Sequence, residues 1–316
     1  MLNGPMSENG RSGQDGRSGH DGGQARAASR TAVLVCQGRA AADGRAAVGR
    51  FADPVAVRLL RDEERAVVEQ VRAGTPPQGW RERTGYESVR ACAEIAVPRT
   101  VAIDEAIRDR ANGQLVILGA GLDTRAWRLA ALAQAEVWEV DHPASQQDKR
   151  ARLAGADARP AARAVHFTAV DLATDDLGAA LDAAGHDPAA PTTWLWEGVV
   201  PYLTREQVRG TLAALAARTA PGSALVLNYQ SPSAKAAAGR LLTRLLGDSV
   251  TAGEPWRSLW KPDRMAALLA EHGLRVTSDH NLLTLARSLG TPTRSRSSLR
   301  TGRVAVAVAV AVAERR

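Results

Sequence analysis

Short apolar runs and longer amphipathic stretches divide this chain into two parts. Between residues 53 and 71 apolar residues recur at helical spacing up to a break at Gly74-Thr75-Pro76-Pro77, and a second helical stretch covers residues 86–110. After Gly113 short apolar runs alternate with helical segments, one of which covers residues 205–219. The predicted strands are 115–118, 137–140, 165–170, 193–196, 224–229, 275–280 and 304–312. Such alternation predicts an α/β fold with a parallel sheet and crossover helices.

The same pattern predicts the domain organisation. Residues 1–30 repeat Gly, Ser, Arg, Asp and Gln and have almost nothing to bury, so we expect a disordered tail. Residues 31–112 form a helical N-terminal cap, and residues 113–316 form the sheet domain. A helical stretch at about 231–263 lies between two strands and is interpreted as an inserted cap. The last strand, VAVAVAVAV, is expected to be buried with Val on one face and Ala on the other.

Composition excludes several classes of protein. No run approaches the roughly 18 apolar residues of a membrane span, and the N-terminus has no apolar core of a secretory signal. Two cysteines, Cys36 and Cys92, provide neither a disulfide framework nor a metal-ligand cluster. We therefore expect a cytoplasmic protein with no membrane partner.

The net charge of +7 raises the question of nucleic acid. Arginine accounts for much of the excess and is scattered or concentrated in the N-terminal tail, with no run of five basic residues. Aromatic residues make up only 4% of the chain, which gives no stacking platform for single strands. We do not expect a nucleic-acid partner.

The most informative motif is a strand, a glycine turn and a helix in LVILGAGLDTRAWRL, residues 115–129. Gly119-Ala120-Gly121 lets the backbone approach a ligand, and the helix N-terminus that follows offers free N–H groups. The dinucleotide fingerprint needs a third glycine where this chain has Thr124. Asp123 stands where a pyrophosphate would lie and suits a cationic group, such as the ammonium of an amino acid.

Acidic residues follow three successive strands. Asp141, which lies twenty residues after Gly121, ends the second strand and can accept both hydroxyls of an adenosine ribose; a role as a helix cap is its alternative. Asp171 follows the third strand, where it could bind the adenine amino group. Glu197 follows the fourth, near the strand-order reversal where ligands bind in open α/β sheets. His142 is expected to order the loop after Asp141.

Six segments together make the chain recognisable. It resembles the bacterial S-adenosylmethionine (SAM)-dependent methyltransferases related to leucine carboxyl methyltransferase, the enzyme that caps the C-terminus of a protein phosphatase. The resemblance extends from about Thr31 to the C-terminus. It is carried by FADPVAVRLL, VPRTVAIDEAI, LVILGAGLDTRAWRL, VWEVDHPASQQDKRARL, FTAVDLATDDL and WLWEGVVPYL.

The resemblance implies a seven-stranded, Rossmann-like class I methyltransferase sheet that is mostly parallel, with its last strand antiparallel, a helical N-terminal cap and an insertion after strand five. It also implies SAM as the cofactor. Arg99 would hold the methionine carboxylate, and Glu197 would lie beside the methionine portion. The full set of implied or inferred cofactor-binding residues is Arg99, Gly119, Ala120, Gly121, Asp123, Asp141, His142, Asp171, Leu172 and Glu197. The phosphatase-specific enzymes also use an N-terminal lysine, which the stretch around Arg39 and Arg45 lacks.

These observations favour O-methylation of a small-molecule acceptor, at a carboxylate or a hydroxyl. The six histidines show no metal-ligand spacing, and no serine-hydrolase elbow is present. No residue is assigned as a catalytic base, although Tyr202 and His280 are candidates. Three alternatives stay open: a nucleic-acid methyltransferase, an NAD(P)-dependent oxidoreductase and a non-catalytic SAM-binding protein.

Overall fold

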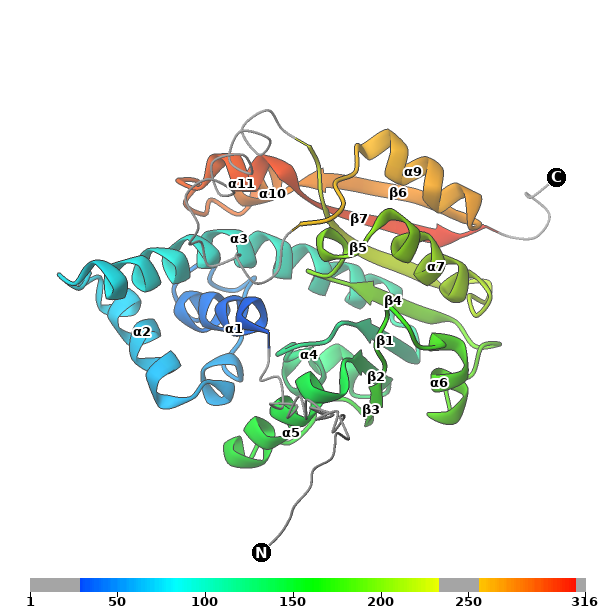
Figure 1. Cartoon of the computed structure of the whole chain (residues 1–316), viewed down its shortest axis with the longest axis horizontal. Helices are drawn as coiled ribbons and strands as arrows, with labels where there is room; N and C mark the ends of the chain where they lie inside the picture. Colours follow the sequence, from blue (N-terminus) through cyan, green and yellow to red (C-terminus); the bar gives the residue numbers. More distant parts are fainter. Residues whose placement is uncertain (1–28, 233–255, 311–316) are drawn as a thin grey trace, which may run out of the picture.

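A seven-stranded sheet forms the centre of the molecule (Figure 1). The computed structural model describes residues 29–232 and 256–310. The strands are β1 (Gln114–Leu118), β2 (Glu136–Asp141), β3 (Ala164–Ala169), β4 (Thr192–Trp196), β5 (Ala224–Gln230), β6 (Leu274–Asn281) and β7 (Gly302–Ala309), in the order β3-β2-β1-β4-β5-β7-β6. β1 to β5 pair in parallel, whereas β7 is antiparallel to both β5 and β6. The predicted class I methyltransferase sheet is confirmed.

Helices precede the sheet and cover one of its faces. They are α1 (Arg30–Ala42), the 3₁₀ turn η1 (Ala56–Leu59), α2 (Asp62–Ala73) and α3 (Trp80–Arg110). The helix expected after Asp53 is divided at Leu60, and α3 begins six residues earlier than its apolar spacing indicated and contains Pro98 in its interior. α3 extends from beside α2 across the sheet, where it contacts β5 and β7 (Figure 1).

Most of the remaining helices follow individual strands. They are α4 (Arg125–Arg128), η2 (Ala130–Leu132), α5 (Pro143–Ala156), α6 (Leu177–Ala183), η3 (Val200–Tyr202), α7 (Arg205–Ala216), α9 (Pro262–Glu271), α10 (Leu282–Ser288) and α11 (Arg296–Thr301). α10 and α11 connect the antiparallel strands β6 and β7. Most of the predicted insertion at 231–263 lies outside the described residues, and α9 begins at Pro262.

Two apolar cores lie on opposite faces of the sheet. One joins alternate residues of β1, β2, β4, β5 and β7 to α1, α3, α10 and α11. The other joins the intervening residues to α6, α7 and α9. β7 shows the division directly, because Val304 belongs to the first core and Ala305 and Ala307 to the second, as the VAVAVAVAV alternation predicted. Helices therefore cover both faces of the sheet.

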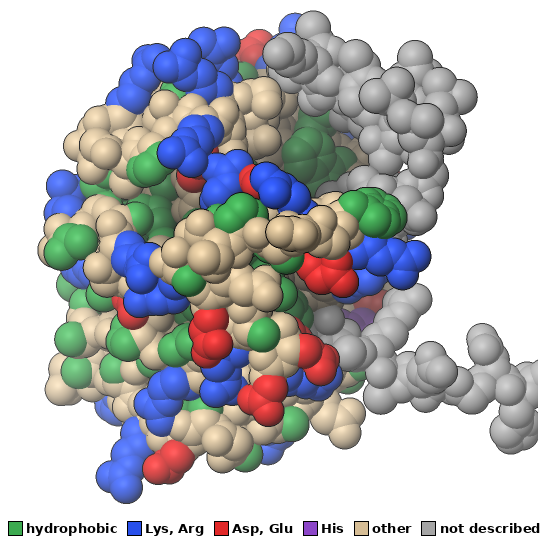
Figure 2. Space-filling model, turned by 90° about the vertical axis from the view of Figure 1, so that its left-hand side faces the viewer, with side chains coloured by type: hydrophobic (Ala, Val, Ile, Leu, Met, Phe, Trp, Pro, Cys, Tyr) green, Lys and Arg blue, Asp and Glu red, His purple; other side chains and the backbone are tan. Residues whose placement is uncertain are grey.

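The surface carries mixed charge. Figure 2 shows Lys and Arg side chains in several separate groups with acidic side chains among them. Within the described ranges, no helix is both long enough and apolar enough to cross a membrane.

Candidate functional site

The loops at the carboxyl ends of the parallel strands bring most of the predicted site residues together. Gly119 and Gly121 have φ angles of +66° and +46°, which glycine adopts without strain. The backbone N–H groups of Gly119 and Ala120 both donate to the carbonyl of Val140, at 2.7 and 3.1 Å. The glycine turn therefore lies directly beside the end of β2.

Asp141 connects this turn to the neighbouring strand. Its Oδ2 accepts a hydrogen bond from the N–H of Gly121 at 2.5 Å, and its Oδ1 accepts from the N–H of His142 at 2.7 Å. The carbonyl of Asp141 also accepts from Val170 at 2.8 Å, which fixes the end of β3. Burial raises the pKa of Asp141, while these two backbone donors oppose the rise.

The loop residues after β2 and β3 have local roles as well. His142 is the N-cap of α5, where its Nδ1 accepts from the N–H of Ala144 at 3.3 Å. Asp171 accepts from the N–H of Ala173 at 2.9 Å, and Leu172 packs against the core under α6 and α7. The role of helix cap, which was the alternative for Asp141, therefore belongs to His142. Asp141 instead orders the glycine turn.

Glu197 lies between two arginines at the end of β4. Its Oε1 is 2.6 Å from Nε of Arg99 on α3, and its Oε2 accepts from Nη1 of Arg125 at 2.8 Å. The positive charge of Arg99 is the largest influence that lowers the pKa of Glu197, followed by that of Arg125, and together they outweigh the effect of burial. The two residues that the sequence assigned to the methionine portion of a cofactor are thus an ion pair.

Asp123 belongs to the same cluster. It contacts Arg125 through both carboxylate oxygens, with Oδ1 accepting from the N–H of Arg125 at 2.7 Å. Although burial acts to raise it, the arginine charges lower the pKa of Asp123 to about 2. This carboxylate is therefore ionised over the whole physiological range, with Arg125 as its counter-charge.

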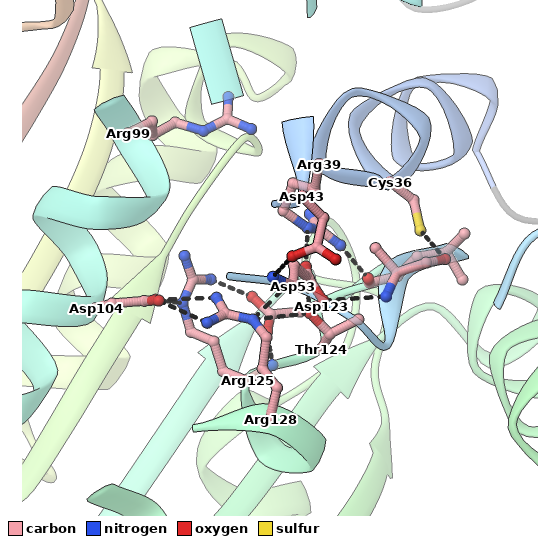
Figure 3. A network of polar contacts seen from close by, with 12 residues as sticks. Cys36, Arg39, Asp43, Asp53, Arg99, Asp104, Asp123, Thr124, Arg125 and Arg128 are labelled. Atoms are coloured by element: carbon pink, nitrogen blue, oxygen red, sulfur yellow. Dashed lines mark hydrogen bonds and ion pairs between the residues drawn. The ribbon is translucent and has the colours of Figure 1, made fainter. Parts of the chain in front are cut away.

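These contacts are part of a larger network of buried charges (Figure 3). Arg125 also donates to Asp104 of α3 at 2.7 Å, and Arg128 donates to the same carboxylate at 2.6 Å. Asp53 accepts from Arg39 of α1 and from the hydroxyl of Thr124, both at 2.7 Å. The four arginines and four carboxylates of this network are Arg39, Arg99, Arg125, Arg128, Asp53, Asp104, Asp123 and Glu197.

The network joins α1 and α3 to the loops that follow β1 and β4. Nη2 of Arg39 donates to the carbonyl of Leu122 at 2.6 Å, immediately after the glycine turn. The side chains of Arg125 and Asp53 are 2% and 0% exposed, so each attracts its own partners in a medium of low dielectric. Removal of one member would leave its partners as buried charges with fewer counter-charges, which is costly.

Sequence reasoning did not single out five members of this network: Arg39, Asp53, Asp104, Arg125 and Arg128. A signal was present, because Asp53, Asp104, Arg125 and Arg128 interrupt the apolar segments FADP, VAIDEAI and LDTRAWRL. Charged residues inside such apolar segments are almost never buried unless paired. Apart from Asp123–Arg125, the ion pairs of the network join positions 14 to 98 residues apart, which no local pattern reveals.

A second buried ion pair lies under the cluster. Nζ of Lys149 on α5 is 2.6 Å from Oε2 of Glu139 on β2 and 4.9 Å from the ring centroid of Trp127. Burial raises the pKa of Glu139 to about 7, although Lys149 acts to lower it. Among the described residues, no group of three or more His, Cys, Asp and Glu side chains could hold a metal ion.

Comparison with known proteins gives consistent family matches. The sequence profile of a family described as leucine carboxyl methyltransferase matches residues 32–216. A Mycobacterium avium protein, provisionally named an S-adenosyl-L-methionine-dependent methyltransferase, is 35% identical over 248 residues, which cover 74% of this chain and 78% of that protein. A Mycobacterium bovis protein with the same provisional name is 37% identical over 216 residues, which cover 65% of this chain and 67% of the M. bovis protein.

Solved structures resemble the chain in fold. A DUF574 family protein from Streptomyces avermitilis has a TM-score of 0.53 at 14% identity, with 89% of this chain and 98% of that chain covered. A protein from Thermobifida fusca, provisionally described as a methyltransferase, has a TM-score of 0.51 at 18% identity, with 87% and 94% covered. At such identities the likeness concerns the fold alone.

Proposed function

The chain belongs to the leucine carboxyl methyltransferase family, and on that premise we propose that it transfers the methyl group of SAM to an oxygen atom of a small-molecule acceptor. The observation that carries the proposal is the arrangement at the carboxyl edge of the sheet. There Asp141 lies against the glycine turn, and the Arg99–Glu197 ion pair lies at the end of β4. Relatives across most of the chain length are named SAM-dependent methyltransferases.

The adenosine half of the cofactor suits the side formed by β2 and β3. Asp141 is held by two backbone N–H groups, so its carboxylate is already oriented before a ribose arrives. Asp171 and Leu172 offer a polar and an apolar contact for adenine. The Gly119-Ala120-Gly121 turn allows close approach of the backbone, and His142 keeps the loop after Asp141 in place by capping α5.

The methionine half suits the Arg99–Glu197 pair. An amino acid carries one carboxylate and one ammonium, and a guanidinium beside a carboxylate is the complementary arrangement of charges. In the proposed complex Arg99 binds the methionine carboxylate, while Glu197 and Asp123 attract the ammonium. Arg125 holds both of these acids in position through its Nη1.

The reaction needs little from the protein beyond alignment. The acceptor oxygen forms a bond to the methyl carbon as the bond from that carbon to sulfur breaks, and S-adenosylhomocysteine (SAH) leaves with the electron pair. Holding the two reactants in line supplies most of the required acceleration. A carboxylate acceptor is already ionised at neutral pH and needs no general base. A hydroxyl acceptor would need one, and Tyr202 of η3 is half-buried whereas His280 of β6 is exposed.

The test is transfer of a radiolabelled methyl group from SAM to matched panels of carboxylic acids, phenols and amines. We expect a labelled product from an acid or a phenol. Treatment with alkali then releases labelled methanol from a methyl ester and leaves an ether intact, which distinguishes the two acceptor types. Transfer to amines alone would overturn O-methylation.

The cofactor site has its own test by calorimetric titration with SAH. Asp141→Ala should weaken binding by about 1–3 kcal/mol, because a buried charge-assisted hydrogen bond is lost. Asp62→Ala is the matched control, since that carboxylate lies fully exposed on α2. Equal affinities in the two variants would refute the site assignment.

A further inference from the structure

A groove between α7 and α9 shares no residue with the network of buried charges. Its volume is about 690 Å³, within the range of sites that hold small molecules. In Figure 1 the two helices lie side by side over the same face of the sheet. The residues that line the groove are Arg205, Arg209, Pro232, Trp256, Arg257, Leu259, Trp260, Lys261, Arg264, Ala267, Leu268 and Glu271.

The apolar part of this groove is aromatic and firmly held. Trp260 is 2% exposed, and its indole N–H donates to Oγ of Ser258 at 3.2 Å. Ser258 in turn donates to the carbonyl of Val200 at 3.0 Å, which ties this wall to η3. The half-buried ring of Trp256 and the side chain of Leu268 extend the wall. A flat, rigid apolar molecule is the shape that such a surface fits.

The polar part of the groove is strongly cationic. Five arginine or lysine side chains line it, with Glu271 as the single acidic residue of the lining, at 3.4 Å from Arg209. Arg205 stacks over Trp260 at 4.8 Å and donates to the carbonyl of Leu259. The other three, Arg257, Lys261 and Arg264, form no ion pair with any residue in the described ranges.

The start of α9 adds to the positive potential. Lys261 is the N-cap of this helix and makes no side-chain capping hydrogen bond, so the first N–H groups lack that partner. The positive end of the helix dipole lies at the same place. Its first-turn acid, Asp263, is exposed and does not line the groove. An anionic group would therefore find two flexible cations and an oriented helix end together.

We propose that this groove binds a small molecule with a planar apolar body and an anionic group, such as an aromatic carboxylate. The body packs against the half-buried ring of Trp256, which the buried Trp260 supports from behind, and the anionic group lies between Lys261 and Arg264. This binding is independent of the proposed methyl transfer, because the groove and the buried charge network share no residue.

Calorimetric titration of the full chain with 2-naphthoate and with its neutral analogue 2-naphthamide tests the proposal. We expect 2-naphthoate to bind at least 10-fold more tightly than 2-naphthamide. The double variant Lys261→Gln/Arg264→Gln should remove that preference while leaving the weaker affinity for 2-naphthamide unchanged. Trp256→Ala should weaken both probes.

Two controls distinguish binding in this groove from binding at other cationic sites of the chain. Arg300→Gln removes an exposed arginine of α11 and should leave both affinities unchanged. Saturation with SAH should not alter 2-naphthoate binding, whereas competition would place the probe at the carboxyl edge of the sheet and overturn the inference. Equal affinity for the two probes, or a preference that survives the double variant, would overturn it as well. Circular dichroism of each variant verifies that these surface substitutions leave the fold intact.

Discussion

Arg125 is the residue on which the candidate site depends most. Its guanidinium contacts Asp104 of α3, Asp123 of the glycine loop and Glu197 at the end of β4. These three carboxylates come from three different elements, and their mutual repulsion would separate the elements without the arginine. Arg125 therefore both stabilises the fold and shapes the pocket proposed for the methionine portion of SAM.

Substitution of Arg125 should be severe. We expect Arg125→Gln to lower the free energy of unfolding by about 3–5 kcal/mol, because Asp104 and Glu197 each lose one of two arginine partners and Asp123 keeps no ion pair among the described residues. Arg125→Lys keeps the charge but loses the planar fork of donors, so its loss should be smaller. Urea denaturation measures both.

The matched control for Arg125 is Arg300→Gln, which replaces an exposed arginine and should change stability by less than about 0.5 kcal/mol. If Arg125→Gln proved as harmless as this control, the network would not be the stabilising unit described above.

At the scale of elements, the glycine turn and η3 pack directly on one another. A Cβ placed on Gly119 would lie 2.2 Å from Cγ2 of Val199, the residue that precedes η3. Gly198, next to it, also has a positive φ of +72°. The loop after β1 and the loop after β4 thus approach so closely that the absence of a side chain is a condition of their packing.

Gly119→Ala should therefore destabilise through two separable effects. Its positive φ costs roughly 1–2 kcal/mol for any L-residue, and the clash with Val199 adds about 1–3 kcal/mol of overpacking. Gly185→Ala is the matched control, since Gly185 has a φ of +79° and no atom lies within 4 Å of the added Cβ.

A double-mutant cycle isolates the clash. Val199→Ala in the Gly119→Ala background should recover at least about 1 kcal/mol relative to its effect in the parent chain. Strict additivity of the two substitutions in urea denaturation would show that the close packing of these loops has no energetic consequence.

For the whole molecule, the two edges of the sheet differ in their response to acid. At the carboxyl edge the arginine network keeps Asp123 ionised down to about pH 2. At the opposite edge His186 is buried between Trp138 and Trp194, with ring centroids 5.3 and 5.2 Å away. Burial, followed by the charge of Arg218, lowers the pKa of His186 to about 4 from an ordinary value of 6.5.

This difference predicts where acid first weakens the fold. Because the folded state favours neutral His186, its contribution is fully present above pH 6.5 and decreases as the pH falls towards 4. His186→Gln removes that titration. Between pH 7 and 4 the free energy of unfolding of this variant should therefore fall by about 1–3 kcal/mol less than that of the parent chain.

Urea denaturation at a series of pH values measures this effect. His280→Gln, at an exposed position on β6, serves as the control and should follow the parent profile. A His186→Gln profile parallel to that of the parent would exclude His186 as the source of the sensitivity.

The sequence by itself determined the fold and most of the cofactor-binding candidates. The signals are local: the spacing of apolar residues, the glycine turns and the acidic residues at strand ends. They can be recognised in the sequence because a strand, its turn and the next helix are continuous in the chain. They located all seven strands, the Gly119–Gly121 turn and the three acids Asp141, Asp171 and Glu197. The carboxyl ends of parallel strands must meet at one edge, so these residues were brought together by topology alone.

Only the tertiary structure decided which charges pair. Glu197 lies between Arg99 and Arg125, which are 98 and 72 residues away in the chain, and Asp53 meets Arg39 and Thr124. The cationic groove between α7 and α9 likewise arises from packing of two separate helices. Pairing of buried charges depends on the distance in space and on the exclusion of water, neither of which a one-dimensional pattern contains.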